Sequence, residues 1–138
     1  MKVQRGILFV CYGNACRSII AEALTKHHFG KFIEVASAGI APLGDIPENT
    51  RSVLEEVGVP WKGLNSKSID SVVLDRFNLI INLMDTPIQP FIPRRFHQMV
   101  IDSYVQDPFG RSLNSYRDTR ETIEKLVLSS LPRWLEAC

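Results

Sequence analysis

The sequence predicts a three-layer α/β fold, with a four-stranded parallel sheet flanked by helices on both faces. Short apolar runs bounded by turn residues alternate four times with stretches of helical periodicity, and right-handed crossovers are the simplest way to join them. No internal repeat, low-complexity segment or long linker interrupts the 138 residues. We therefore expect a single domain spanning residues 1–138.

Four short apolar segments are the predicted strands. The first is an unbroken apolar run that ends in a glycine-containing loop, as expected of a strand buried on both faces. The third has the strongest strand character, because branched aliphatic residues dominate it. The predicted strands are Gly6–Val10, Phe32–Ser37, Leu79–Leu83 and Met99–Ile101.

Two helices are predicted in the first half of the chain. After the first strand, apolar residues recur at helical spacing from Ile20 to His27. Asp45 offers an N-cap for the second helix, with Glu48 three residues later, and its apolar stripe runs to Val57. Each helix thus follows a predicted strand.

The predicted helices in the second half of the chain are shorter and less regular, apart from the last. Residues 72–77 predict a short helix, and three prolines reduce residues 88–96 to at most a short irregular one. Helical spacing of apolar residues resumes at Ser112, and Pro132 is expected to kink or end this last helix.

Composition excludes several classes of protein. Sixteen basic and fifteen acidic residues give a formal charge of +1 with no block of like charge, which argues against a nucleic-acid partner. No apolar run approaches the ~18 residues of a membrane-spanning helix, and the first residues lack a signal-peptide pattern. The sequence therefore predicts a cytoplasmic protein without a membrane partner.

The cysteines are expected to act as thiols. Cys11, Cys16 and Cys138 are too few and too unevenly spaced for a disulfide framework or a zinc site. The histidines also lack ligand spacing, so we expect no metal and no cofactor.

The loop after the first strand has the features of an anion site. Residues 11–18 read Cys-Tyr-Gly-Asn-Ala-Cys-Arg-Ser and lead into a helix, whose N-terminal N–H groups attract anions. Gly13 lets the backbone approach a ligand, and Asn14 tolerates a left-handed conformation while its amide braces the loop. Arg17 can bind two oxygens of a tetrahedral oxyanion. The absence of Gly-Lys-Ser/Thr and of further glycines excludes the common nucleotide loops.

A nucleophile and an acid accompany this loop. The field that binds phosphate also favours the thiolate of Cys11, which makes it a candidate nucleophile. Asp107, in the loop after the fourth strand, is the candidate general acid, because Pro108 keeps it out of a helix. Both loops lie at the carboxyl edge of the predicted sheet, where such folds bind ligands. The rival carboxylates are Asp70, Asp85 and Asp102.

These motifs resemble the low-molecular-weight protein tyrosine phosphatase family. The resemblance rests on Cys11–Ser18, on Ser37-Ala-Gly39, on Met84-Asp85 and on Asp107-Pro-Phe-Gly110, and it favours the bacterial, arsenate-reductase-like branch. It implies the predicted fold, with the phosphate-binding loop after the first strand, and a metal-independent protein-tyrosine-phosphatase.

The resemblance also implies roles for individual residues. Cys11 forms a phosphocysteine, Arg17 clamps the phosphoryl oxygens, and Asp107 protonates the leaving group and then activates water. Ser37 supports Asn14, and Pro108 supports Asp107. The remaining residues expected to contact substrate or order the loop are Tyr12, Gly13, Asn14, Ala15, Cys16 and Ser18.

Several positions depart from the family pattern. Ile19 replaces the usual proline, and Asn65 stands where many members have a histidine that supports the loop. Ala15 is smaller than the residue found in many tyrosine or arginine phosphatases. Cys16 is either a redox partner that forms a reversible disulfide with Cys11 or a small packing residue.

The substrate is expected to be a phosphorylated protein or a small aryl phosphate, with inorganic phosphate and other tetrahedral oxyanions as inhibitors. Phosphotyrosine is preferred because a deep cradle selects a long aryl phosphate, and phosphoarginine is the first alternative. Arsenate reduction is a second alternative, although this chain has no cysteine between residues 17 and 137 to relay oxidation. A non-catalytic anion-binding module is a third. Arg111, Arg117 and Arg120 indicate either an acidic partner surface or a solvated helix face.

Overall fold

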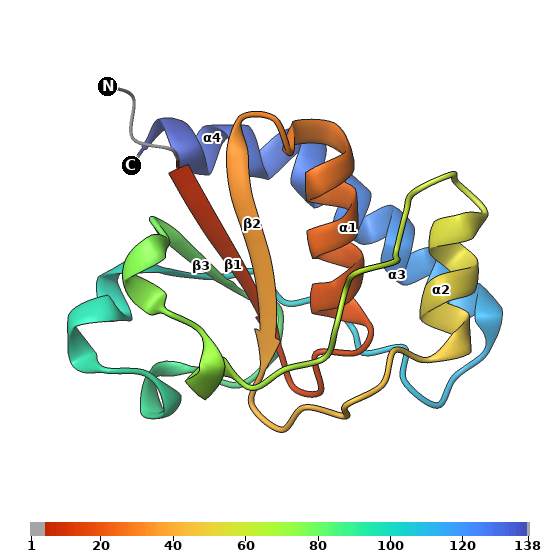
Figure 1. Cartoon of the computed structure of the whole chain (residues 1–138), viewed down its shortest axis with the longest axis horizontal. Coiled ribbons are helices and arrows are strands. Elements are labelled where there is room, and N and C mark those ends of the chain that lie inside the picture. The colour runs from red at the N-terminus through yellow and green to blue at the C-terminus, as the bar shows by residue number, and fades with distance from the viewer. Residues whose placement is uncertain (1–4, 138) are drawn as a thin grey trace.

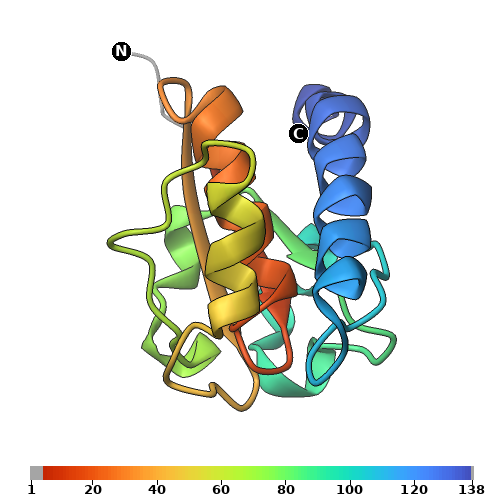
Figure 2. The same cartoon turned by 90° about the vertical axis from the view of Figure 1, so that its right-hand side faces the viewer.

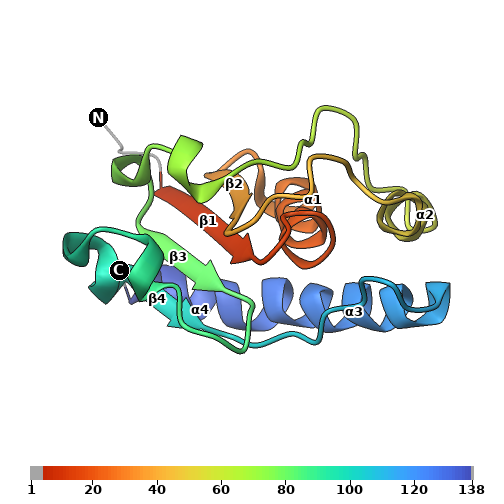
Figure 3. The ribbon, with the colours of Figure 1, turned by 90° about the horizontal axis from the view of Figure 1, so that it is seen from below.

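The computed structural model describes residues 5–137. Its four strands are parallel and lie in the order β2-β1-β3-β4 (Figures 1 and 3). They are β1 (Arg5–Cys11), β2 (Ile33–Gly39), β3 (Leu79–Asn82) and β4 (Val100–Asp102). The four predicted strands are confirmed, with ends shifted by one or two residues. The strand order reverses at β1, so the carboxyl end of β1 is the expected ligand site of an open α/β sheet.

The four α-helices lie on one side of the sheet (Figures 2 and 3), where the first helix packs on β1 and β2 and the second packs on the first and the third. Ile7 and Phe9 of β1 and Ile81 of β3 point to this face, and alternate residues of the strands form a continuous core with the helices. The helices are α1 (Arg17–Phe29), α2 (Glu48–Glu55), α3 (Leu113–Lys125) and α4 (Leu131–Glu136).

Short 3₁₀ helices cover the opposite face. Leu8 and Val10 of β1 and Ile80 of β3 pack there against Phe77 and Phe96. The helices are η1 (Ile69–Ser71), η2 (Leu74–Arg76), η3 (Gln89–Phe91) and η4 (Arg94–Met99). The prediction of helices on both faces is confirmed, but the two coverings differ in kind. None of the helices within residues 5–137 is long and apolar enough to cross a membrane.

The predicted start and end of the second helix are wrong. Asp45 does not cap α2, which begins at Glu48 directly after Pro47 without a side-chain cap. The fixed φ of Pro47 suits it to the residue just before a helix, so Asp45 lies too early and stays exposed. Val57 also lies outside the helix and is exposed, because the chain turns at Gly58, whose φ is +70°.

Two further predictions are corrected in part. Residues 72–77 form no continuous helix: within them only η2, which is three residues long, is helical, and η1 ends just before them at Ser71. Pro132 does not end the last helix: a π-helical turn, η5 (Leu126–Ser130), follows α3, and Pro132 lies in the first turn of α4. A proline is tolerated in a first turn, where its missing N–H has no helical partner to lose.

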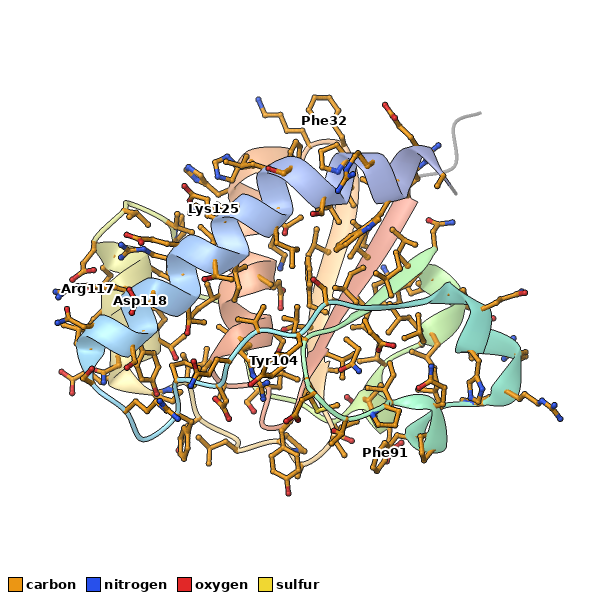
Figure 4. All side chains as sticks on the ribbon, turned by 180° about the vertical axis from the view of Figure 1, so that it is seen from behind. Phe32, Phe91, Tyr104, Arg117, Asp118 and Lys125 are labelled. Carbon is orange, nitrogen blue, oxygen red and sulfur yellow. The ribbon has the colours of Figure 1, made fainter. Side chains whose placement is uncertain are left out.

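Glu56 links α2 to α3. Its carboxylate accepts from Arg117 at 2.6 Å and from Arg120 at 2.7 Å. Arg120 also donates to the carbonyl of Val53 at 3.0 Å. The hydrogen bonds from both arginines lower the pKa of Glu56 to about 2. Figure 4 shows Arg117 on the same helix as Asp118 and Lys125, and its pairing with Glu56 favours the interpretation of a solvated helix face.

We expect Glu56→Gln to lower the Tm at neutral pH. The pKa of Glu56 in the folded state lies below the usual Glu value of about 4.3, so its contribution is fully present above that value. The contribution is lost as the pH falls through about 2, and the two proteins should then melt alike. Thermal unfolding from pH 2 to 7 measures this, with exposed Glu136→Gln as the control. A difference in Tm that stays constant over that range contradicts the assignment.

Candidate active site

The loop between β1 and α1 turns its carbonyl groups outward. Five carbonyls of residues 11–16 accept hydrogen bonds from segments outside the loop or from α1. Backbone N–H groups donate from Ile40 to Cys11 (3.3 Å), from Ala41 to Tyr12 (2.8 Å), from Leu43 to Gly13 (2.9 Å) and from Ile20 to Cys16 (2.9 Å), and the Thr50 hydroxyl donates to Ala15 (2.9 Å). The C=O and N–H groups of a trans peptide point in opposite directions, so the loop N–H groups face inward. This arrangement fits the predicted anion cradle.

Two residues allow the tight path of this loop. Asn14 has a φ of +45°, the left-handed conformation expected from the sequence. Gly39, at the end of β2, lies against the loop, and a Cβ at this position would come within 2.8 Å of the Asn14 nitrogen and of the Tyr12 oxygen. Only glycine permits this approach.

Cys11 lies at the bottom of the cradle, at the end of β1. Its sulfur is 2.9 Å from the hydroxyl oxygen of Ser18, which lies in the first turn of α1. Both residues are buried. A hydroxyl at this distance stabilises a thiolate when its proton points to the sulfur.

Ser18 is one end of a buried chain of hydrogen bonds. The Asn14 amide donates to Ser18 at 2.7 Å and to Ser37 at 2.9 Å. Ser37 donates to Oε1 of Glu22 at 2.5 Å, and Lys26 contacts Oε2 of the same carboxylate at 2.5 Å. The predicted support of Asn14 by Ser37 is thus present as a contact. Glu22 was missed, because a glutamate inside a helix usually faces solvent, whereas this one is 4% exposed.

Arg17 is buried with one nitrogen free. Its Nη1 donates to the carbonyls of Leu83 at 3.2 Å and Val105 at 3.1 Å, which fixes the plane of the guanidinium. Its Nη2 lies 3.5 Å from Oδ2 of Asp107. Its Nε has no hydrogen-bond partner in the described part of the chain. Nε and Nη2 form one edge of the guanidinium, so this edge is available for two oxygens of an anion.

Asp107 lies beside the cradle with half of its side chain exposed. It accepts from the backbone N–H of Phe109 at 3.0 Å, and Pro108 is buried between them. Among the rival carboxylates, Asp102 accepts from the amide of Asn82 at 3.0 Å. Asp70, Asp85 and Asp102 do not line the cavity that contains Cys11.

A cavity of about 170 Å³ joins these groups. Its mouth is apolar, because the half-exposed side chains of Tyr12, Leu43 and Phe109 line it. The other lining residues are Cys11, Gly13, Ala15, Cys16, Arg17, Ala41 and Asp107. Leu43 and Phe109 were not predicted as site residues, since nothing distinguishes an apolar loop residue before the loops are brought together.

Cys16 faces the core under the helices. Its sulfur is 3.5 Å from the hydroxyl of Tyr116 on α3. Burial raises the pKa of Cys16 to about 11, against opposing hydrogen bonds from Tyr116 and Thr50. Packing is therefore one clear role of Cys16, and its disulfide with Cys11 stays a prediction. Cys138 lies outside the described residues.

Ile19 and Asn65 are two positions that depart from the family pattern, and the loop is ordered without the usual residues there. Ile19 is fully buried in α1, which begins without a proline. The Asn65 side chain does not reach the loop and lies 3.4 Å from the Lys67 ammonium. Its neighbours support the loop instead: the Lys67 N–H donates to Oδ1 of Asn14 at 2.9 Å, and the Ser66 hydroxyl donates to the Gly13 carbonyl at 3.0 Å.

The cradle contains positively charged and partially positive groups of its own. Arg17 and the inward N–H groups are the donors that the cradle offers. Within residues 5–137, no group of three or more His, Cys, Asp or Glu side chains is placed to hold a metal ion.

Comparison with known proteins gives consistent matches along nearly the whole chain. Residues 6–136 match the family described as "Low molecular weight phosphotyrosine protein phosphatase". An arsenate reductase of Brevibacillus brevis is 33% identical over 128 residues, covering 89% of this chain and 91% of that protein.

Two solved structures are also similar. An arsenate reductase in its phosphate-binding state has a TM-score of 0.82 at 26% identity, covering 94% of this chain and 98% of that one. The arginine phosphatase YwlE, as a mutant with a phosphorylated active-site serine, has a TM-score of 0.83 at 26% identity, covering 95% of each chain.

Proposed function

Because the chain belongs to the low molecular weight phosphotyrosine protein phosphatase family, we propose that it is a cysteine-dependent phosphomonoesterase. The observation that carries this proposal is the unpaired Nε of Arg17, buried in the same cavity as the Cys11 sulfur. An orphaned buried donor is costly, and an oxyanion satisfies it. The phosphate-bound relative and the phosphorylated active site of the arginine phosphatase support the same chemistry.

The reaction proceeds in two steps. The phosphoryl oxygens accept from the loop N–H groups and from the free edge of Arg17. The Cys11 thiolate then attacks phosphorus, an S–P bond forms, and the P–O bond to the leaving group breaks. Asp107 donates a proton to the leaving oxygen and afterwards takes a proton from the water that cleaves the phosphocysteine.

The cavity favours an aryl phosphate. Tyr12, Leu43 and Phe109 offer apolar surface to a flat ring. Among the described residues, Asp107 is the one carboxylate that lines the cavity. It already lies beside Arg17, so the walls offer little to a charged guanidinium. Geometry thus favours phosphotyrosine, whereas the named relatives favour the arginine phosphatase and arsenate reductase alternatives.

We expect Cys11→Ser to abolish hydrolysis of para-nitrophenyl phosphate, lowering kcat by at least about 10³-fold, because a serine hydroxyl is a far weaker nucleophile at neutral pH. Exposed Lys31→Ala, far from the cavity, is the control. Hydrolysis that survives in Cys11→Ser excludes the proposed mechanism. Inhibition of the wild type by inorganic phosphate checks the anion cradle separately.

The wild type should show a higher kcat/KM for a phosphotyrosine peptide than for the matched phosphoarginine peptide. We expect this because the mouth of the cavity is apolar. Phe109→Ala should reduce the difference in kcat/KM between the two peptides. A preference for phosphoarginine in the same assay assigns the chain to the arginine phosphatase alternative.

Arsenate reduction is the second candidate, since an arsenate reductase is 33% identical to this chain. In that reaction the Cys11 thiolate displaces hydroxide from arsenate, and a second thiol attacks the Cys11 sulfur. A disulfide forms, the electron pair passes to arsenic, and arsenite leaves; an external dithiol then reduces the disulfide. Within residues 5–137, Cys16 is the only other thiol, and burial raises its pKa to about 11.

Such a buried thiol is a slow resolving group, so we expect arsenate to inhibit phosphate ester hydrolysis without catalytic formation of arsenite. Arsenite is measured with thioredoxin, thioredoxin reductase and NADPH as the source of electrons, and Cys16→Ser is the matched variant. Sustained arsenite formation that Cys16→Ser abolishes reverses the ranking of the two candidates.

A further inference from the structure

The amide of Asn14 is held in one orientation by two kinds of partner. Its Oδ1 accepts from the backbone N–H of Lys67 at 2.9 Å, and a backbone N–H can only donate. Its Nδ2 therefore faces the hydroxyl oxygens of Ser18 and Ser37 and donates to both. Each hydroxyl oxygen accepts a hydrogen bond from Nδ2, so its own proton must point elsewhere.

Glu22 decides where the proton of Ser37 goes. A carboxylate can only accept, so Ser37 donates to Oε1 of Glu22 at 2.5 Å. This leaves the lone pairs of Ser37 toward the Asn14 amide. The other oxygen of Glu22 is paired with Lys26, whose side chain is about half exposed.

Ser18 lies at the other end of this chain of contacts, next to Cys11. Within the chain, the Cys11 sulfur is the acceptor left for the Ser18 proton. With Nδ2 of Asn14 donating to its oxygen, the Ser18 hydroxyl is free to donate to the Cys11 sulfur 2.9 Å away. Asn14, Ser18 and Ser37 are each 0% exposed, so water does not compete for these bonds. The direction of every bond then follows from the two fixed ends.

We propose that Glu22 is a positioning residue that fixes the direction of this chain of hydrogen bonds, so that Ser18 donates to the Cys11 thiolate. The proposal rests on the proposed function only in taking Cys11 as the nucleophile. Glu22 acts as an obligatory acceptor, through Ser37 and Asn14, and touches neither substrate nor Cys11.

The alternative arrangement shows what Glu22 prevents. If the Asn14 amide turned over, Oδ1 would face both hydroxyls, and Ser18 would donate to it instead of to Cys11. The Glu22 carboxyl group opposes this, because Ser37 donates its hydrogen bond to Glu22. The Ser37 oxygen and Oδ1 of Asn14 would then face each other as two acceptors. The turned amide would also leave the Lys67 N–H facing Nδ2, donor against donor. Glu22 and the Lys67 N–H thus both disfavour the turned orientation of the Asn14 amide.

The test compares Glu22→Met, which has no acceptor, with Glu22→Gln, which keeps one acceptor oxygen without the charge. The pH dependence of Cys11 alkylation by iodoacetamide reports the thiolate, with the modified sulfur located by fragmentation mass spectrometry. We expect the midpoint of alkylation to rise by about one pH unit in Glu22→Met, because one hydrogen bond to the charged sulfur is lost. Glu22→Gln should stay close to the wild type.

Kinetics provide a second readout. For para-nitrophenyl phosphate, kcat should fall by up to about tenfold in Glu22→Met at pH values below the midpoint of alkylation, while KM changes less than about twofold, because the inward N–H groups and Arg17 still bind the phosphoryl group. Lys26→Met removes the cationic partner of Glu22 but keeps the Glu22 oxygen that accepts from Ser37. Its alkylation midpoint and its kcat should therefore match those of the wild type.

Ser37→Ala breaks the same link from the other side. The double variant Glu22→Met/Ser37→Ala should be no worse than Ser37→Ala alone, because two changes in one chain do not add. Ser37→Ala also keeps the test available if Glu22→Met does not fold, as thermal unfolding will show.

Three results overturn the proposal. The first is an alkylation midpoint in folded Glu22→Met equal to that of the wild type, and the second is the same result in Ser37→Ala. The third is an equal rise of the midpoint in Glu22→Gln and Glu22→Met, which would indicate that Glu22 acts through its charge and not through the direction of the hydrogen bonds. Alkylation needs no substrate, so this proposal can fail while phosphatase activity stands, and a failure of the proposed function leaves the alkylation result readable.

Discussion

The structure depends on keeping the guanidinium of Arg17 buried and oriented. A charge taken out of water is costly unless fixed polar groups surround it. The carbonyls of Leu83, directly after β3, and Val105, just beyond β4, bind one nitrogen, and the carboxylate of Asp107 lies beside another. Three segments that meet only in the folded sheet therefore position one side chain. The loop after β1, the strand ends and the loop of Asp107 form a single arrangement around it.

The sequence predicts the sheet well because its signals are local. Each strand is an apolar run that can be identified by itself, and β1 and β3, whose runs are unbroken, lie in the middle of the sheet. The failures come from competition between neighbouring residues. Asp45 is a good capping residue, but Pro47 determines where α2 starts. Pro132 is a good helix breaker, but a π-helical turn before it allows a new helix to begin.

The site is predictable only where its residues are adjacent in sequence or form a known motif. Cys11 and Arg17 are found from one loop, and Asp107 from the general position of loops at the carboxyl edge. The support of Asn14 by Lys67 comes from a backbone N–H, which leaves no signature in the amino-acid sequence. Glu22 has the pattern of an ordinary helix residue, and its burial depends on β2, which brings Ser37 to it.

The loop of residues 11–16 lies on the boundary between the two cores of the molecule. Cys11 packs with the core under the 3₁₀ helices, whereas Ala15 and Cys16 pack with the core under the α-helices. The two ends of the loop are therefore held by packing on opposite faces of the sheet. A change of volume in either core shifts one end of the loop relative to the other. Residues remote from the cavity can thus tune the distance between the sulfur and the groups that bind its target.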